Sequence, residues 1–91
     1  MFDFDYSDEL KTILKKVHKK DKIKHEEILK KIGEIINQTP ETINHYKNLR
    51  HNLSDRKRVH IGKNFVLTFK VFLKENFILF VNFDHGDNIY K

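Results

Sequence analysis

Two arginines and a histidine stand at alternate positions in one short segment of the chain. Positions 56 to 61 read Arg-Lys-Arg-Val-His-Ile. Successive side chains of a strand point to opposite faces, which places Arg56, Arg58 and His60 on one face and Val59 and Ile61 on the other. An imidazole can accept or donate a proton near neutral pH. This face is a candidate for acid–base chemistry or for binding. The alternative is an exposed polar face with no function.

The same region concentrates positive charge. The chain has 18 Lys and Arg against 13 Asp and Glu, with a pI of about 9.5, a balance that favours polyanionic partners. Between positions 43 and 63, Asp55 is the single acid. The basic residues and histidines of this segment are Lys47, Arg50, Arg56, Lys57, Arg58, Lys63, His45, His51 and His60. Such clustering indicates a cationic surface more strongly than the net charge does.

A second set of candidate residues lies at the C-terminus. His85 follows an apolar run and precedes Gly86, and the aromatic Tyr90 is the penultimate residue. Taken alone, these residues are explained better by a terminal loop with a packing aromatic. The basic strand elsewhere in the same predicted sheet favours a functional interpretation, because it adds Arg58 and His60.

Several classes of site are excluded by composition. The chain has no Cys, which excludes disulfides, thiolate metal sites and a Cys nucleophile, and fits a reducing cytosol. The six histidines, at 18, 25, 45, 51, 60 and 85, lack the spacing of a local metal site. We therefore expect no metal and no cofactor. The N-terminus does not resemble a signal peptide, and no apolar run approaches the roughly 20 residues that span a bilayer. A cytoplasmic protein is expected.

The first half of the chain predicts a strand followed by two helices. Residues 1–6 alternate aromatic and acidic side chains, which is typical of an edge strand with one buried face. Ser7 is a candidate N-cap for a helix that ends near Lys20 and Asp21. A second run with helical periodicity covers residues 28–36 and ends before Pro40. Two helices with a short connection should form an antiparallel hairpin.

After Pro40 the pattern predicts strands. We expect them around residues 44–53, at 56–61, at 64–73 and at 77–84, with turns at 62–63 and 74–76. The short connections predict an antiparallel meander. The chain of 91 residues is therefore expected to form a single α+β domain. It should have an N-terminal strand, an antiparallel helical hairpin, and then a three- to four-stranded, mainly antiparallel sheet with both helices on one face.

The order and spacing of these motifs resemble the RelE/ParE superfamily of toxins. The resemblance is carried by residues 58–71 and by the closing stretch 83–91, and it is strongest to the YafQ-like and archaeal RelE branches. The opening Tyr6-Ser7-Asp8-Glu9-Leu10-Lys11 is also similar. The resemblance implies a RelE-like fold and a toxin of a type II toxin–antitoxin system. It also implies an activity, cleavage of mRNA, commonly on the ribosome, in which an RNA 2′-hydroxyl attacks the adjacent phosphate.

The resemblance also implies roles for individual residues. His60 and His85 match histidines of the YafQ-like toxins, and we expect them to meet on one side of the sheet as the acid–base pair. Tyr90 fits the family's terminal aromatic and is expected to stack on or orient a base. Arg58 resembles a cationic strand position. Arg58 and Arg56 are the expected phosphate clamps, and further contacts to RNA are expected from Lys47, Arg50, Lys57 and Lys63.

Three positions depart from the family pattern. Asn64 stands where YafQ-like toxins often have Asp, Lys47 where some have a further His, and Val66 where RelE proper tends to have Arg.

Two alternative functions stay open on the sequence alone. A ParE-like relative would act on DNA gyrase, and a non-catalytic module would bind RNA or the ribosome through the cationic strands.

The resemblance implies a protein partner as well. Toxins of this kind are neutralised by a RelB-like antitoxin, in complexes that can be heterotetramers. The strands at 64–73 and 77–84 are apolar on both faces, as Phe72, Phe77, Ile78 and Phe80 illustrate. One helical hairpin cannot cover both faces. We therefore expect an acidic or amphipathic antitoxin segment to cover the remaining surface.

Overall fold

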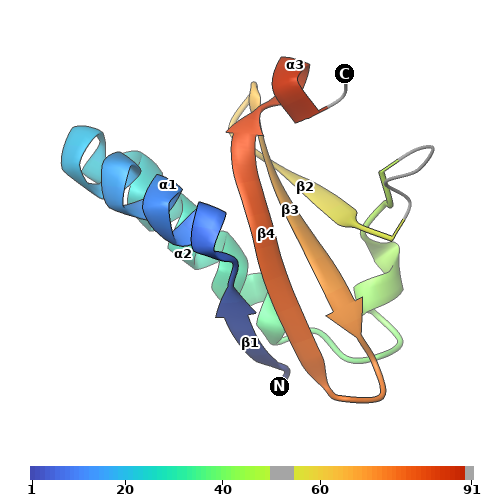
Figure 1. Cartoon of the computed structure of the whole chain (residues 1–91). Helices are drawn as coiled ribbons and strands as arrows, with labels where there is room; N and C mark the ends of the chain where they lie inside the picture. The colour runs from blue at the N-terminus through green and yellow to red at the C-terminus, as the bar shows by residue number, and fades with distance from the viewer. Residues whose placement is uncertain (50–54, 90–91) are drawn as a thin grey trace.

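A computed structural model describes residues 1–49 and 55–89 of the chain. Figure 1 shows an N-terminal strand, a pair of helices, a four-stranded sheet and a short C-terminal helix. The helices and strands in chain order are β1 (Asp3–Tyr6), α1 (Asp8–Lys20), α2 (Lys22–Ile36), the 3-10 helix η1 (Ile43–His45), β2 (Lys57–Ile61), β3 (Phe65–Phe72), β4 (Phe77–His85) and α3 (Gly86–Ile89). The predicted α+β class and order of the main elements are confirmed.

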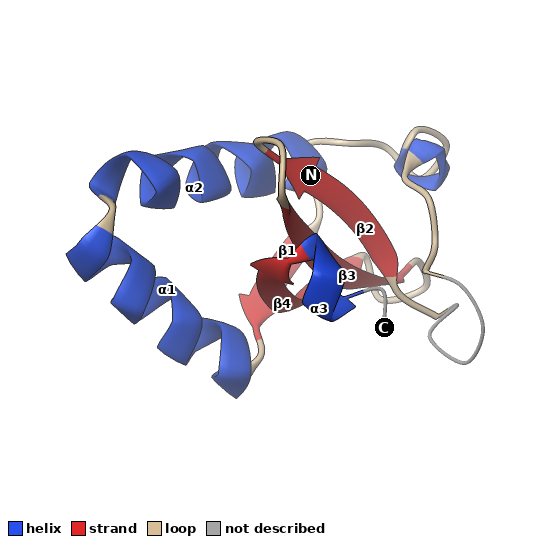
Figure 2. Cartoon of the chain, turned by 90° about the horizontal axis from the view of Figure 1, so that it is seen from above, coloured by secondary structure: helices blue, strands red, loops and turns tan. Residues whose placement is uncertain are grey.

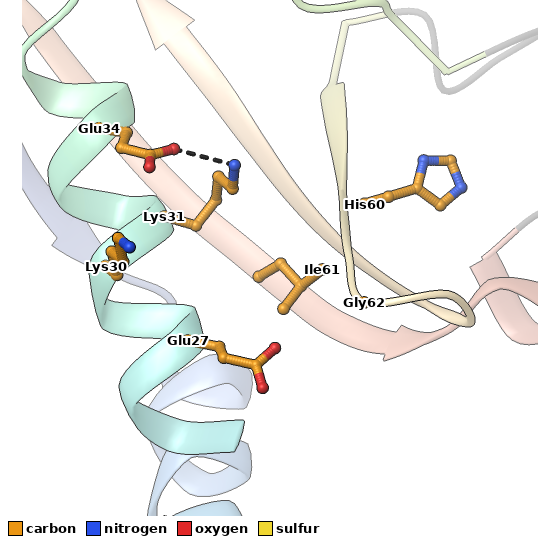
Figure 3. Close-up of a pocket in the computed structure, with 7 residues that line it drawn as sticks. All are labelled: Glu27, Lys30, Lys31, Glu34, His60, Ile61 and Gly62. Carbon is orange, nitrogen blue, oxygen red and sulfur yellow. Dashed lines mark ion pairs between the residues drawn. The ribbon is translucent and has the colours of Figure 1, made fainter. Parts of the chain in front are cut away.

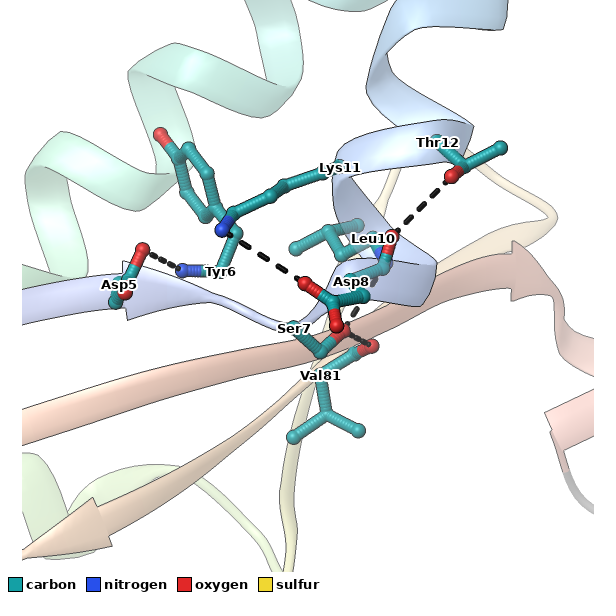
Figure 4. Close-up of polar contacts among 8 residues, drawn as sticks. All are labelled: Asp5, Tyr6, Ser7, Asp8, Leu10, Lys11, Thr12 and Val81. Atoms are coloured by element: carbon teal, nitrogen blue, oxygen red, sulfur yellow. Dashed lines mark hydrogen bonds and ion pairs between the residues drawn. The ribbon is translucent and has the colours of Figure 1, made fainter.

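Both long helices begin at a side-chain cap. The Ser7 hydroxyl accepts a hydrogen bond from the Leu10 backbone N–H at 3.0 Å and donates one to the Val81 carbonyl of β4 at 2.5 Å (Figure 4). Asp21 ends α1 and caps α2, where its carboxylate accepts from the Lys24 N–H at 3.0 Å. Caps satisfy backbone donors that have no partner within the helix. Ser7 therefore fixes the start of α1 and also joins it to the sheet.

The sheet has the strand order β1-β4-β3-β2. β2, β3 and β4 form the expected antiparallel meander, and β1 pairs with β4 in parallel. The β2–β3 turn contains Gly62 at φ +68, and the β3–β4 turn contains Asn76 at φ 51, both residue types that tolerate this backbone region. A register shift at Thr68/Phe69 marks a bulge between β3 and β4.

The hydrophobic core lies between the helical hairpin and one face of the sheet. Figure 2 shows α1 and α2 together on one side of the strands. The largest fully buried apolar side chains of this core come from both layers; they are Leu10, Ile28, Ile35, Ile43, Leu67, Phe69, Ile78 and Phe80. They belong to one continuous cluster, which holds the hairpin against the sheet. Within the described residues, no helix is long and apolar enough to cross a membrane.

The prediction of a strand around residues 44–53 is wrong for residues 44–49, which the structure describes. Residues 43–45 form η1, and only an isolated bridge pairs Asn48 with Lys57. The apolar side chains here are spaced by three, at Ile43, Tyr46 and Leu49, and not by the two that a strand requires. Ile43 and Leu49 are buried, and Tyr46 packs edge-on against a core phenylalanine. Positions 50–54 of the expected strand lie outside the described residues.

Candidate active site

The strand register divides the side chains of β2, β3 and β4 between two faces. Directly paired residues share a face, so His60, Val66 and Asp84 form one row across the three strands. The next row, of Ile61, Phe65 and His85, belongs to the opposite face. Ile61 is buried in the core with the helices. The side chains of β2–β4 that share the face of His60 therefore point away from α1 and α2, and we call this the open face, although its central residues Val66 and Thr68 are buried.

His60 is the exposed imidazole of the open face. Figure 3 shows its ring pointing away from α2, whereas the neighbouring Ile61 points toward that helix. Both residues contribute to the wall of a pocket of about 240 Å³ between α2 and β2, which is otherwise lined by Glu27, Lys30, Lys31, Glu34 and Gly62. In the described part of the chain, the His60 imidazole has no hydrogen-bond or ion-pair partner. It is therefore accessible to a ligand from solvent.

Arg58 lies on the open face one strand step from His60, as the alternation predicts. It pairs directly with Thr68 of β3, which in turn pairs with Asn82 of β4. The Arg58 side chain is half-buried and engaged with other groups, and its backbone N–H donates to the Lys47 carbonyl at 2.8 Å. The open face thus presents two parallel rows, with a guanidinium in one row and an imidazole in the other.

The expectation that His60 and His85 meet on one side of the sheet is wrong. His85 pairs with Phe65, and its ring lies edge-on to the Phe65 ring at 5.7 Å on the side of the helices. Its Nδ1 accepts a hydrogen bond from the Asp87 N–H at 3.2 Å and lies 3.5 Å from the Asp87 carboxylate. Beyond the bulge, residues 82–85 of β4 alternate between the two faces, so the residue that shares a face with His60 is Asp84.

Asp84 is a polar residue that the sequence analysis did not single out. Its Oδ1 accepts hydrogen bonds from the His85 N–H at 2.7 Å and the Asn88 side-chain amide at 3.1 Å. The carboxylate is half-buried. The signal that could have identified it was the alternation itself, since a polar residue next to a buried Phe83 must lie on the opposite face of β4.

The cationic residues predicted to contact RNA have different environments. Lys57 shares the helix-facing side of β2, and its ammonium donates to the Tyr46 carbonyl at 3.1 Å and the Asn48 side chain at 3.2 Å. Burial lowers the pKa of Lys57. This arrangement ties segment 46–48 to β2, which favours a structural role over a phosphate contact. Lys47 and Lys63 are exposed.

The structure shows fewer contacts for the remaining residues that were predicted to bind RNA or take part in catalysis. Arg56 precedes β2, and its Nε is buried without a hydrogen-bond partner in the described part of the chain. Arg50 and Tyr90 lie outside the described residues, so their roles stay predictions. Among residues 1–49 and 55–89, no three His, Asp or Glu side chains gather closely enough to hold a metal ion.

Two of the three residues that depart from the family pattern, Asn64 and Val66, lie at the end of the sheet that contains the β2–β3 turn. Asn64 lies in the β2–β3 turn, where its carbonyl accepts the Gly86 N–H at 2.7 Å and so joins this turn to the start of α3. Val66 is fully buried between His60 and Asp84. α3 contacts β3 and β4 at this end. The site thus combines His60 and Arg58 of β2 with the β2–β3 turn, the end of β4 and α3.

Sequence comparison identifies two archaeal relatives. A protein of Methanocaldococcus jannaschii described as "Putative toxin RelE4" is 52% identical over 91 residues, covering 100% of this chain and 93% of the relative. An uncharacterized protein of Methanosarcina mazei is 39% identical over 82 residues, covering 90% of this chain and 91% of the relative. No protein-family profile matches the sequence.

Comparison with solved structures identifies the same fold in bacterial toxins. A mutant of YafQ from E. coli superimposes with a TM-score of 0.76 at 14% identity, covering 100% of both chains. A metal-bound toxin from Helicobacter pylori gives a TM-score of 0.76 at 19% identity, covering 98% of this chain and 99% of that one. At these identities the similarity concerns the fold.

Proposed function

Because the chain belongs to the RelE family of toxins, we propose that it is the toxin of a type II toxin–antitoxin system and a metal-independent endoribonuclease that cleaves mRNA on the ribosome in the cytoplasm. The observation that carries the proposal is the open face, where His60 is exposed and Arg58 lies two residues away on the same strand. A proton-transfer group beside a permanent cation is what phosphodiester cleavage requires.

The reaction needs no group beyond the RNA and side chains of this kind. The 2′-hydroxyl oxygen bonds to phosphorus, the bond from phosphorus to the 5′-oxygen breaks, and the products carry a 2′,3′-cyclic phosphate and a 5′-hydroxyl. One proton leaves the 2′-hydroxyl and one is delivered to the 5′-oxygen. His60 can perform one of these transfers, and the Arg58 guanidinium can stabilise the charge that develops on the phosphate oxygens.

Exposed lysines of the basic segment supply a further, non-specific attraction to RNA. Lys47 and Lys63 flank β2 in sequence and both are exposed. Each phosphate neutralised by such a cation releases counterions, which makes RNA binding weaken steeply as salt rises. This attraction accounts for association with RNA, while the chemistry depends on the open face.

An antitoxin partner is proposed from the apolar part of the open face. Phe72 and Phe77 pair at the end of the β3–β4 hairpin and point away from the core that contains Ile78 and Phe80. Phe72 is 41% exposed and Leu73 in the adjoining turn is 49% exposed. Contiguous apolar surface of this kind indicates a protein interface. Replacing Phe72 by Asp should weaken co-purification with a co-expressed RelB-like antitoxin while the fold is retained.

The proposed activity is tested with the purified chain, ribosomes programmed with a defined message, and the same message without ribosomes. We expect cleavage products with cyclic phosphate ends in the ribosome reaction. Metal independence is tested in the ribosome-free reaction, where any cleavage should persist after EDTA is added. RNA binding without products would indicate a binding module. Inhibition of gyrase supercoiling without RNA cleavage would indicate a ParE-like toxin.

A further inference from the structure

Asp84 shares the open face and the strand row of His60. Two inter-strand spacings separate the two backbones, or about 9–10 Å. Val66 occupies the position between them, is fully buried and contributes no polar group. The imidazole is exposed and the carboxylate is half-buried. The row therefore has an apolar centre that is flanked by an imidazole on one side and a carboxylate on the other.

We propose that Asp84 is the second acid–base residue of the site, opposite His60, and that it accepts the proton of the RNA 2′-hydroxyl. This inference rests on the proposed ribonuclease activity and names a residue for it. Transfer of a proton from the attacking oxygen and to the leaving oxygen requires two groups on opposite sides of phosphorus. The register places His60 and Asp84 on the same face, two strands apart, and places His85 on the opposite face.

The proton balance assigns the two roles. An ionised carboxylate only accepts, so Asp84 takes the proton as the 2′-oxygen bonds to phosphorus. The His60 imidazolium gives its proton to the 5′-oxygen as the bond to phosphorus breaks. After the reaction Asp84 is protonated and His60 is neutral, and exchange with water restores both. No oxidant, reductant or further reactant is needed.

The hydrogen bonds of Asp84 leave one oxygen for this role. Both bonds end on Oδ1, from the His85 N–H and the Asn88 amide. In the described part of the chain, Oδ2 has no hydrogen-bond partner. Oδ1 thus holds the carboxylate in place against α3. Other charged groups near this end of the open face are Arg58 on β2 and Asp87 on α3, and Lys70 lies further along β3 in an ion pair with Asp55.

A purely structural role for Asp84 as a brace for α3 makes a different prediction. Asn at position 84 keeps an oxygen that can accept both hydrogen bonds and has nearly the same shape, but it cannot take a proton. Asp84→Asn therefore removes the chemistry and preserves the brace. Asp87→Asn is the matched control, because it removes a neighbouring exposed carboxylate on the adjoining helix.

The experiment measures single-turnover cleavage of a defined message on programmed ribosomes. We expect Asp84→Asn to cleave about 10²-fold more slowly than the wild type. Its RNA affinity and thermal stability should be unchanged. Asp87→Asn should cleave within a few-fold of the wild type.

One outcome overturns the inference and leaves the proposed function intact: an Asp84→Asn variant that cleaves at the wild-type rate. If His85→Gln then loses activity, the role belongs to His85. If the wild type itself releases no products under any condition, the proposed ribonuclease function fails first. The inference then fails with it, and the wild-type control makes the two failures distinguishable.

Discussion

The hydroxyl of Ser7 makes two hydrogen bonds that Ala cannot replace. It accepts from the Leu10 N–H in the first turn of α1 and donates to the Val81 carbonyl of β4. Loss of an N-cap costs about 0.5–2 kcal/mol. The part-buried Val81 carbonyl would lose a partner as well, which adds about 1 kcal/mol. Ser7→Ala should therefore lower the free energy of unfolding by about 1.5–3 kcal/mol.

The assay is urea unfolding followed by circular dichroism, with Thr12→Ala as the matched control. Thr12 also makes a side-chain hydrogen bond on α1, to the Asp8 carbonyl at 3.2 Å, but in an exposed position (Figure 4). Its removal should change stability by less than about 0.5 kcal/mol. A loss of about 2 kcal/mol in Ser7→Ala corresponds to a fall in Tm of roughly 8–16 °C. Equal stabilities of the two variants would refute the reasoning that Ser7 joins α1 to the sheet.

Two further predictions concern titration and backbone conformation. Burial raises the pKa of Tyr6, to which Asp5 also contributes, and burial raises the pKa of Tyr46. The folded state holds these two protons more tightly than the unfolded state does. The stability that this contributes is fully present below the ordinary tyrosine pKa of about 10, and it is lost as pH rises through the higher folded-state pKa. Absorbance titration at alkaline pH should show that Tyr6 and Tyr46 ionise above the ordinary tyrosine pKa. Replacing either tyrosine by Phe should remove one of these late transitions, and an unchanged titration curve would contradict the prediction. Gly62→Ala should destabilise by about 1–2 kcal/mol because of its φ of +68, whereas Gly33→Ala, in helix α2 with open space around it, should stabilise by about 0.5–1 kcal/mol in the same urea assay. The opposite order of the two glycine variants would contradict the assigned conformations.

The elements with a strong local signal could be predicted from the sequence. The alternation of Phe2, Phe4 and Tyr6 predicted β1, and the Ser7 cap with its helical periodicity predicted α1. The turns at Gly62 and Asn76 predicted the meander. What the local pattern did not contain is the parallel pairing of β1 with β4, because it depends on residues from opposite ends of the chain.

The candidate site could be predicted only in part, for a similar reason. His60 and Arg58 were identified because alternation within β2 alone places them on one face. The partner of His60 depends on the pairing of β2 with β3 and of β3 with β4, and a shift of one residue moves a side chain to the other face. The family resemblance led to the prediction that His85 is the partner of His60. The strand register instead places the preceding residue, Asp84, on the face of His60.

The central claim, that the open face of the sheet cleaves RNA through His60, is tested most directly by one pair of variants. Single-turnover cleavage of a defined message on programmed ribosomes is measured for His60→Gln and for His18→Gln, which removes an exposed imidazole on α1. We predict a rate about 10²-fold or more below the wild type for His60→Gln and a rate near the wild type for His18→Gln, with both variants folded by circular dichroism. A folded His60→Gln variant that cleaves as fast as the wild type would contradict the claim.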